Sequence, residues 1–121
     1  MSRVQLYVYD LTQGLAKQFS MALLGKQIDG VWHTGVVVFG IEYFYGGGIQ
    51  RGIPGKTVAG TPVQIHDLGT TMASQQEFEH FLSEISHRFT PETYSLLKHN
   101  CNTFSNEASL LLTGNPIPEC K

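Results

Sequence analysis

Apolar and polar positions near the start of the chain predict a strand followed by a helix. The stretch VQLYVY, residues 4–9, is rich in β-branched and aromatic residues and alternates in part, which is typical of a strand. Apolar residues then recur at helical spacing. Asp10 or Thr12 can cap this predicted helix, and Gly25 can end it.

Three further strands are predicted in the middle of the chain. GVWHTGVVVFG, residues 30–40, is apolar throughout its second half, which predicts a strand buried on both faces. IEYFYGGGI, residues 41–49, predicts the next strand, with a turn near Gly40. RGIPGKTVAGTP, residues 51–62, has the composition of a loop, and PVQIHDL, residues 62–68, that of a short strand.

Helical patterns fill the last third of the chain. Ser74 and Glu77 form an S-x-x-E capping box ahead of an apolar stripe, which predicts a helix over residues 74–89. Pro91 suits the first position of a second helix, because its missing N–H has no helical partner there.

The last predicted helix begins near Asn100, runs to Leu112 and is closed by Gly114. The element order is therefore βα–βββ–ααα, without an internal repeat. This order predicts a single α+β domain over residues 1–121, in which a small antiparallel sheet packs against helices.

Composition and charge narrow the class of protein. The chain has 121 residues, of which 41% are apolar and 15% charged, fractions typical of a globular domain. The net charge of -2 argues against a nucleic acid as partner. No apolar run approaches the ~20 residues of a membrane span, and the N-terminus lacks the apolar core of a signal peptide. Two cysteines make no disulfide framework, so we expect a reducing environment.

Cys101 lies in the stretch KHNCNTFSNEASLLLTG, residues 98–114. With Asn100 as the N-cap, Cys101 is the first helical residue, where the helix dipole favours a thiolate and N–H groups can hold an oxyanion. A buried structural cysteine is the ordinary alternative. A cysteine nucleophile also needs a base, and the chain offers five histidines.

Four of the histidines are weak candidates for that base. His80 and His87 lie off the apolar stripe of their predicted helix, so we expect them at the surface. His66 is near the end of a short strand, with no functional argument. His99 is only two residues before Cys101, so its side chain is expected to point away from the sulfur and to serve packing.

His33 differs, because it begins a strand that is otherwise apolar, where an ionisable group is costly without a partner or a task. A hairpin that turns about Gly40–Ile41 would place His33 opposite Gly48. With Gly46 and Gly47, this glycine would leave room for the backbone of a substrate beside His33. A satisfied core histidine and a glycine bulge are the ordinary alternatives.

Metal and serine chemistry have little support. His33, His99 and Cys101 are too few and badly spaced for zinc, and neither C-x-x-C nor H-x-x-x-H occurs. The G-x-S-x-G motif of serine hydrolases is also missing from the sequence. We therefore expect a site without metal or cofactor.

A cysteine at a helix start that faces a histidine on a strand is the arrangement of papain-like cysteine hydrolases. Here His33 precedes Cys101, the reverse of the papain order, which predicts a circularly permuted papain-like fold. Four stretches carry a more specific resemblance: LYVYDLTQGLA, LLGKQIDGVWHTGVVV, FYGGGI and KHNCNTFSNEASLLLTG. On these stretches the chain resembles the PPPDE family of permuted papain-fold peptidases.

The resemblance implies that His33 and Cys101 are the catalytic residues of a thiol peptidase. It implies as substrate the isopeptide bond between the C-terminus of SUMO, a ubiquitin-like modifier, and a lysine of a modified protein. A homodimer with its active site in a groove near the subunit interface, and residence in cytoplasm and nucleus, are implied in the same way. Relatives are also associated with removal of S-palmitoyl groups.

The expected mechanism is that of a Cys–His dyad. Cys101 attacks the scissile carbonyl as a thiolate, which His33 stabilises as imidazolium before it protonates the leaving amine or thiol. The backbone N–H of Cys101 stabilises the oxyanion. Water activated by His33 then hydrolyses the thioester intermediate.

Other residues near the dyad are assigned by weaker patterns. Asn100 and Asn102 are expected to serve the helix cap and the local turn rather than catalysis. Trp32 either covers the dyad and excludes water or belongs to the core. Gln50 and Asp67 are conceivable third members of the site, but the pattern places neither of them.

Three functions are consistent with such a site. The first is an isopeptidase for SUMO-conjugated proteins, and the second is a thioesterase that acts on S-acylated proteins with the same dyad. The third is a non-catalytic module that binds modified proteins, which has no need of both Cys101 and His33. A purely structural dimerisation domain would leave the buried histidine unexplained.

Overall fold

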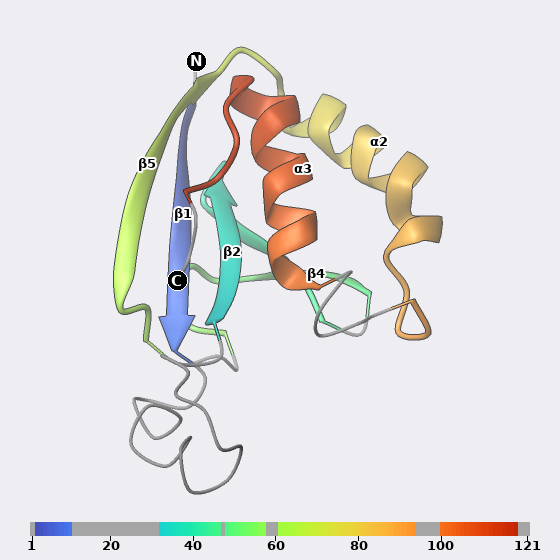
Figure 1. Cartoon of the computed structure of the whole chain (residues 1–121). Helices are drawn as coiled ribbons and strands as arrows, with labels where there is room; N and C mark the ends of the chain where they lie inside the picture. Colours follow the sequence, from blue (N-terminus) through green and yellow to red (C-terminus); the bar gives the residue numbers. More distant parts are fainter. Residues whose placement is uncertain (1, 11–31, 47, 58–60, 94–99, 119–121) are drawn as a thin grey trace, which may run out of the picture.

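The computed structural model describes residues 2–10, 32–46, 48–57, 61–93 and 100–118. Figure 1 shows a sheet with two helices packed against it. The strands are β1 (Ser2–Asp10), β2 (Trp32–Val38), β3 (Ile41–Tyr45), β4 (Ile49–Gly52) and β5 (Gln64–Thr71). The helical elements are α2 (Gln75–Ile85), the 3-10 turn η1 (Ser86–Arg88) and α3 (Cys101–Thr113).

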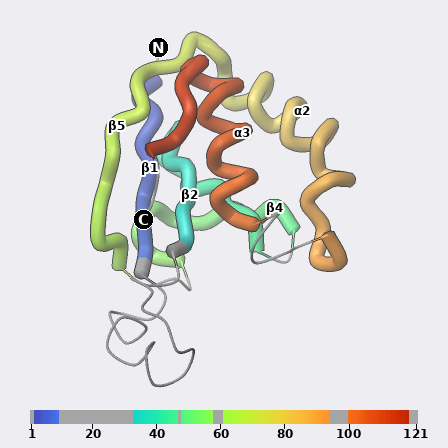
Figure 2. The backbone as a smooth tube through the Cα atoms, in the orientation of Figure 1, coloured from blue at the N-terminus to red at the C-terminus, as the bar shows by residue number. Residues whose placement is uncertain are grey.

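The strands follow the order β4-β3-β2-β1-β5 in the sheet, and every neighbouring pair is antiparallel. After α3 the chain turns back beside the sheet, as Figure 2 shows. There the Asn115 side chain donates a hydrogen bond to the backbone oxygen of Leu68 (3.2 Å). The predicted α+β class, with a small antiparallel sheet and packed helices, is confirmed.

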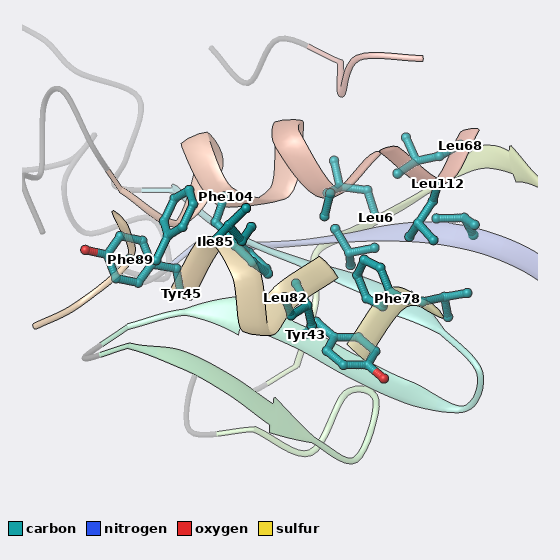
Figure 3. Close-up of a cluster of buried hydrophobic side chains, with 14 of the residues drawn as sticks. Leu6, Tyr43, Tyr45, Leu68, Phe78, Leu82, Ile85, Phe89, Phe104 and Leu112 are labelled. Carbon is teal, nitrogen blue, oxygen red and sulfur yellow. The ribbon is translucent and has the colours of Figure 1, made fainter. Parts of the chain in front are cut away.

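One face of the sheet shares a hydrophobic core with α2 and α3, and we call it the helix face (Figure 3). The buried members of this core are Val4, Leu6, Val8, Val36, Val38, Tyr43, Tyr45, Leu68, Phe78, Leu82, Ile85, Phe89, Phe104, Ala108 and Leu112. Because side chains alternate along a strand, Tyr9, His33 and Glu42 belong to the opposite side, which we call the second face. Val37 on the second face is also buried, so the prediction that β2 is buried on both faces is confirmed.

β4 was not predicted, and the loop expected from residue 51 instead begins after Gly52. The sequence of β4, IQRG, has no apolar alternation, and its middle residues are exposed. It is a strand because a three-residue connection after Tyr45 folds it back on β3, where Tyr45 pairs with Ile49. Tertiary pairing rather than pattern creates this strand.

The register of the β2–β3 hairpin also differs from the prediction. Val38 pairs with Ile41, so the turn is formed by Phe39 and Gly40, with φ of 59° and 74°. Positive φ at both central residues is the geometry of a type I′ turn, which matches the twist of paired strands. Phe39 gives no sequence signal for it, because residues other than glycine rarely adopt this conformation.

The helix ends bear out most of the capping predictions. The Ser74 hydroxyl accepts the Glu77 N–H (3.1 Å), and the Glu77 carboxylate accepts the Ser74 N–H (2.9 Å). The helix ends at Ile85, earlier than predicted, and η1 continues it. The last helix has the predicted N-cap, and Gly114 closes it with a φ of 78°.

Two predicted helices lie wholly or mostly outside the described residues. The helix between Thr12 and Gly25 lies outside the described residues. Of the helix expected to begin at Pro91, only residues 91–93 are described, and they form a turn. No helix in the described ranges is long and apolar enough to cross a membrane.

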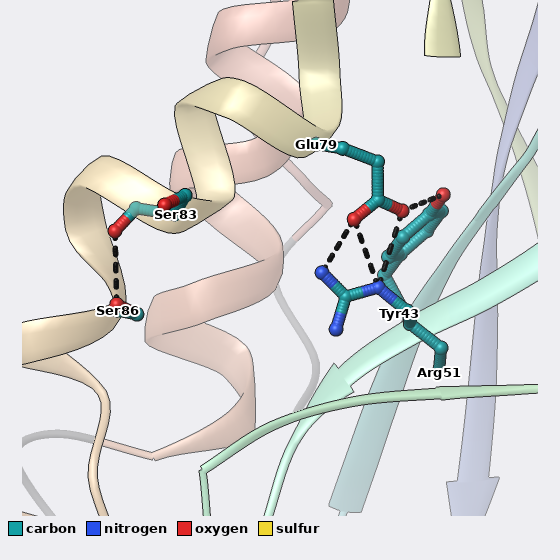
Figure 4. A network of polar contacts seen from close by, with 5 residues as sticks. All are labelled: Tyr43, Arg51, Glu79, Ser83 and Ser86. Carbon is teal, nitrogen blue, oxygen red and sulfur yellow. Dashed lines mark hydrogen bonds and ion pairs between the residues drawn. The ribbon is translucent and has the colours of Figure 1, made fainter. Parts of the chain in front are cut away.

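A polar cluster ties α2 to the β3–β4 hairpin (Figure 4). The Arg51 Nε donates to both carboxylate oxygens of Glu79 (3.0 and 3.1 Å), which also accept the Tyr43 hydroxyl (2.9 Å). The Arg51 guanidinium beside Glu79 lowers the pKa of that carboxyl. Because Arg51 also lies over the Tyr43 ring (5.8 Å), the cluster fixes how α2 sits on the sheet edge.

The capping box of α2 gives a test of the local energetics. We expect Ser74→Ala to lower the free energy of unfolding by about 1 kcal/mol, because it removes the hydroxyl that accepts the Glu77 N–H in the first turn. Ser83→Ala, an exposed serine within the same helix, is the control and should change stability by less than about 0.5 kcal/mol. Urea unfolding followed by circular dichroism measures both, and equal effects would contradict the assignment.

Candidate active site

Cys101 is the first residue of α3 and is buried, with 2% of its surface exposed. The Asn100 side-chain oxygen accepts the N–H groups of Asn102 (2.9 Å) and Thr103 (3.2 Å). The Thr103 hydroxyl in turn accepts the Asn100 N–H (3.2 Å), which completes a capping box. The predicted capping role of Asn100 is confirmed, and it fixes Cys101 at a helix N-terminus.

This position has a chemical consequence for the sulfur. The first turn of a helix carries a partial positive charge, which stabilises a thiolate relative to a thiol. Burial opposes ionisation, because it removes the thiolate from water. At Cys101 the helix N-terminus favours the thiolate, whereas burial favours the thiol. A base that takes the thiol proton during attack would therefore assist the reaction of this sulfur.

His33 is the second residue of β2 and is also buried, with 8% of its surface exposed. Its ring lies between two aromatic rings, with centroid distances of 5.5 Å to Tyr9 and 5.6 Å to Phe44. Burial lowers the pKa of His33 from its ordinary value of 6.5 to about 4. The imidazole is therefore neutral at physiological pH, the form that can accept a proton.

Thr34 joins the strand that carries His33 to the helix that carries Cys101. Its hydroxyl oxygen lies 2.8 Å from the Asn102 side-chain oxygen, to which it donates, and 2.8 Å from the Ser105 hydroxyl. Thr34 follows His33 directly, and Asn102 follows Cys101 directly. The fold thus brings together the starts of β2 and α3, which are 68 residues apart in the sequence.

The His33 side chain leaves β2 on the face opposite Thr34. Thr34 points to α3, so His33, its neighbour on β2, projects from the second face toward Tyr9 and Phe44. The dyad of His33 and Cys101 stays a prediction.

Similarity to known proteins decides the family of this chain. The family model described as "PPPDE putative peptidase domain" matches residues 2–120. The chain belongs to the PPPDE family. Because members are permuted papain-fold peptidases, the predicted fold and the predicted class of enzyme, a peptidase, are confirmed.

Several PPPDE relatives extend beyond the length of this chain. Desumoylating isopeptidase 1 is 47% identical in Xenopus laevis and 48% in Homo sapiens, in both cases over 117 residues. These alignments cover 95% of this chain and 69% and 70% of the relatives. The DeSI-like protein sdu1 of Schizosaccharomyces pombe is 33% identical over an alignment of 127 positions, which covers 96% of this chain and 60% of the relative.

The supporting residues predicted for the site have mixed outcomes. Asn102 was expected to serve the cap or local turn; its N–H does so, but its side chain bonds to Thr34 instead. It therefore fixes α3 to β2, a contact that sequence spacing cannot reveal. Trp32 begins β2 and pairs with Asp10, but its side chain lies outside the described residues.

Of the three glycines predicted to line a cleft, Gly46 is the one that the strand register brings to the start of β2. The observed register, continued from the Val36–Tyr43 pair, brings position 33 opposite Gly46 rather than Gly48. A Cβ atom on Gly46 would meet nothing within 4 Å, so space is open there. Gly48 has a φ of 107° and is needed for the turn, and Gly47 lies outside the described residues.

The two conceivable third residues lie on strands other than β2. Asp67 lies on β5, separated from β2 by β1, where it accepts the Gly69 N–H (2.9 Å). Gln50 pairs with Phe44 but lies on β4, two strands away from β2.

His80 and His87 are exposed, as predicted, and His66 is half-buried. His80 bonds to Glu84 at 2.8 Å, His87 contacts the Glu84 backbone oxygen at 2.9 Å, and His66 contacts Gln64 at 3.0 Å. Within the described ranges no group of three potential metal ligands occurs. His99 and Cys120 lie outside those ranges.

Sequence reasoning missed a buried carboxylate on the second face. Glu42 of β3 is fully buried, and its oxygens lie 2.8 and 2.7 Å from the Tyr9 hydroxyl, which donates to them. The Gly55 N–H donates to the same carboxylate (3.0 Å). The available signal was a glutamate within the otherwise apolar strand IEYFY, paired across the hairpin with a valine-rich strand.

The contacts of Thr34 predict that loss of its hydroxyl group destabilises the protein and loosens the first turn of α3. Thr34→Val removes this hydroxyl and takes a partner from the buried Ser105 hydroxyl and the half-buried Asn102 side chain, so we expect a loss of about 1–3 kcal/mol in the free energy of unfolding. Amide exchange at residues 102–105 should also accelerate, because the first turn of α3 is released. Thr71→Val, another buried threonine, is the control and should leave that exchange unchanged. Unchanged exchange in Thr34→Val would contradict the assignment.

Burial of His33 predicts an acid-sensitive stability. Its pKa is about 4 in the folded protein and near 6.5 when unfolded, so its contribution is complete above about pH 6.5 and is lost as the pH falls toward 4. Between about pH 7.5 and 4.5 we expect the wild type to lose roughly 2–3 kcal/mol more stability than His33→Gln. Urea unfolding at both pH values measures this, with the exposed His80→Gln as the control that should follow the wild type. Parallel losses in wild type and His33→Gln would disprove it.

Proposed function

We propose that this chain is a cysteine isopeptidase that removes SUMO from protein lysines. The similarity to desumoylating isopeptidase 1 over most of the chain supports the substrate. The observation that carries the chemistry is a buried cysteine at the first position of a capped helix, whose first turn is bonded to the strand of His33.

In the proposed reaction Cys101 is the nucleophile and His33 the base. The sulfur attacks the carbonyl carbon of the isopeptide bond while its proton passes to the imidazole. The imidazolium then protonates the lysine amine as the C–N bond breaks, which leaves a thioester on Cys101. Water, deprotonated by His33, hydrolyses this thioester and restores the thiol.

The resting state differs from the thiolate–imidazolium pair expected from the sequence. Burial lowers the pKa of His33 to about 4 and so favours a neutral imidazole at rest. The proton then moves in the transition state, when the sulfur forms its bond to carbon. A neutral imidazole avoids a buried positive charge in the free enzyme.

The first turn of α3 is the proposed oxyanion site. The cap bonds hold the Asn102 and Thr103 N–H groups and so fix the direction of the turn that begins with Cys101. We assign the Cys101 N–H as one donor to the oxyanion, since it adjoins the sulfur. The open space at Gly46 suits the slim Gly-Gly tail of a ubiquitin-like modifier.

Other parts of the proposal rest on the family alone. They are a homodimer with the active site near its interface, and residence in the cytoplasm and nucleus. Cleavage of S-acyl thioesters by the same two residues is the alternative activity, because the sulfur attacks an ester carbonyl by the same route.

Two substitutions test the catalytic proposal. Cys101→Ser and His33→Ala should each lower the rate of cleavage of an isopeptide-linked SUMO conjugate by at least about 100-fold, because each removes a reacting group. Gel analysis of conjugate cleavage measures this, with a fatty-acyl thioester peptide assayed in parallel. Cys120→Ser and His80→Ala are the matched controls and should retain activity.

The possible outcomes separate the three candidate functions. Cleavage of the acyl thioester alone would replace the isopeptidase by a thioesterase. Binding of the SUMO conjugate without cleavage by the wild type would favour a binding module. Full activity of either site variant would disprove the dyad.

A further inference from the structure

Glu42 is the one acidic residue that is fully buried in the described part of the chain. Burial of a carboxylate is costly unless hydrogen bonds replace its water. The Tyr9 hydroxyl and the Gly55 N–H supply those bonds. A packing role does not explain this choice, because an apolar residue of β3 would fill the same space without that cost.

The carboxylate reaches toward the strand that carries the candidate base. Glu42 pairs with Val37 of β2, yet its side chain extends over Gly35, where a Cβ atom would lie only 2.4 Å from a Glu42 oxygen. The neighbouring position on this face of β2 is His33. Gly35 therefore opens a path for Glu42 across β2 to Tyr9 on β1.

Tyr9 connects the carboxylate to the imidazole. It pairs directly with His33 in the β1–β2 register, and the two rings lie 5.5 Å apart at an angle of 47°. Its hydroxyl is fixed at the other end by Glu42. Burial first, and then Glu42, raise the pKa of the Tyr9 phenol, so it stays a hydrogen-bond donor.

We propose that Glu42 and Tyr9 are positioning residues that hold the His33 imidazole in its working orientation. Papain-like sites usually orient the histidine with a polar residue bonded to the ring; here a carboxylate acts through a tyrosine ring that packs against it. The inference rests on the proposed role of His33 as base. It assigns the orienting function to residues on β1 and β3, the two strands that flank β2.

The chain offers a matched comparison for this tyrosine. Tyr43 is also fully buried, and its hydroxyl also donates to a glutamate, Glu79 (2.9 Å), but on the helix face and away from His33 (Figure 4). Tyr9→Phe and Tyr43→Phe thus each remove one phenol–carboxylate bond. A difference in catalysis between them reports position rather than loss of a hydrogen bond in general.

The experiment compares steady-state cleavage of a SUMO conjugate by the two variants after urea unfolding has shown both to be folded. We expect Tyr9→Phe to lower kcat about ten-fold with KM within about two-fold, because orientation of the base matters in the transition state. Tyr43→Phe should keep kcat within about two-fold of the wild type. Equal kcat values in the two variants would overturn the inference.

Glu42→Gln separates geometry from charge. The amide oxygen can still accept from Tyr9 and Gly55, so a positioning role predicts that kcat stays within about three-fold of the wild type. A loss as large as that of Tyr9→Phe would mean that the charge itself acts on the base, which overturns positioning through the phenol.

The failure of this inference is distinct from failure of the proposed function. If Cys101→Ser and His33→Ala abolish cleavage while Tyr9→Phe and Tyr43→Phe behave alike, only the positioning role is lost. If cleavage survives His33→Ala, the proposed function fails and the positioning role fails with it.

Discussion

The hydrogen bonds of Thr34 are the constraint on which the site depends, because they fix the first turn of α3 against the start of β2. The hydrophobic core brings the same helix and sheet together, but apolar contacts are non-directional and tolerate small shifts along the helix axis. A buried hydroxyl between Asn102 and Ser105 tolerates no such shift without leaving polar atoms unpaired. The core thus supplies most of the stability, while one polar contact sets the alignment of the strand and the helix.

The two faces of the sheet have different tasks. The helix face is almost wholly apolar and makes the core with α2 and α3. The second face holds His33, Tyr9 and Glu42, which are buried although all three carry polar groups. Because side chains alternate along β2, this strand contributes to the apolar core from one face and to the polar cluster of His33, Tyr9 and Glu42 from the other. A one-residue slip of this strand would exchange the two sets and destroy both.

Burial gives the candidate site its electrostatic character. The imidazole of His33 is neutral at rest, because burial lowers its pKa to about 4. Cys101 is buried at the capped N-terminus of α3, where the helix dipole favours negative charge. The buried Glu42 side chain is bonded to two neutral donors, the Tyr9 phenol and the Gly55 N–H.

The sequence by itself determined the local features: the capping box at Ser74, the N-cap at Asn100, the closing Gly114 and the buried character of β2. These depend on residues a few positions apart, where dihedral preference and hydrogen-bond reach are decided locally. Only the tertiary structure decided strand β4, the register of the β2–β3 hairpin, the bond from Thr34 to Asn102 and the burial of Glu42 beside Tyr9. Each of these joins residues distant in the chain, and a partner across a sheet leaves no periodic trace in either segment.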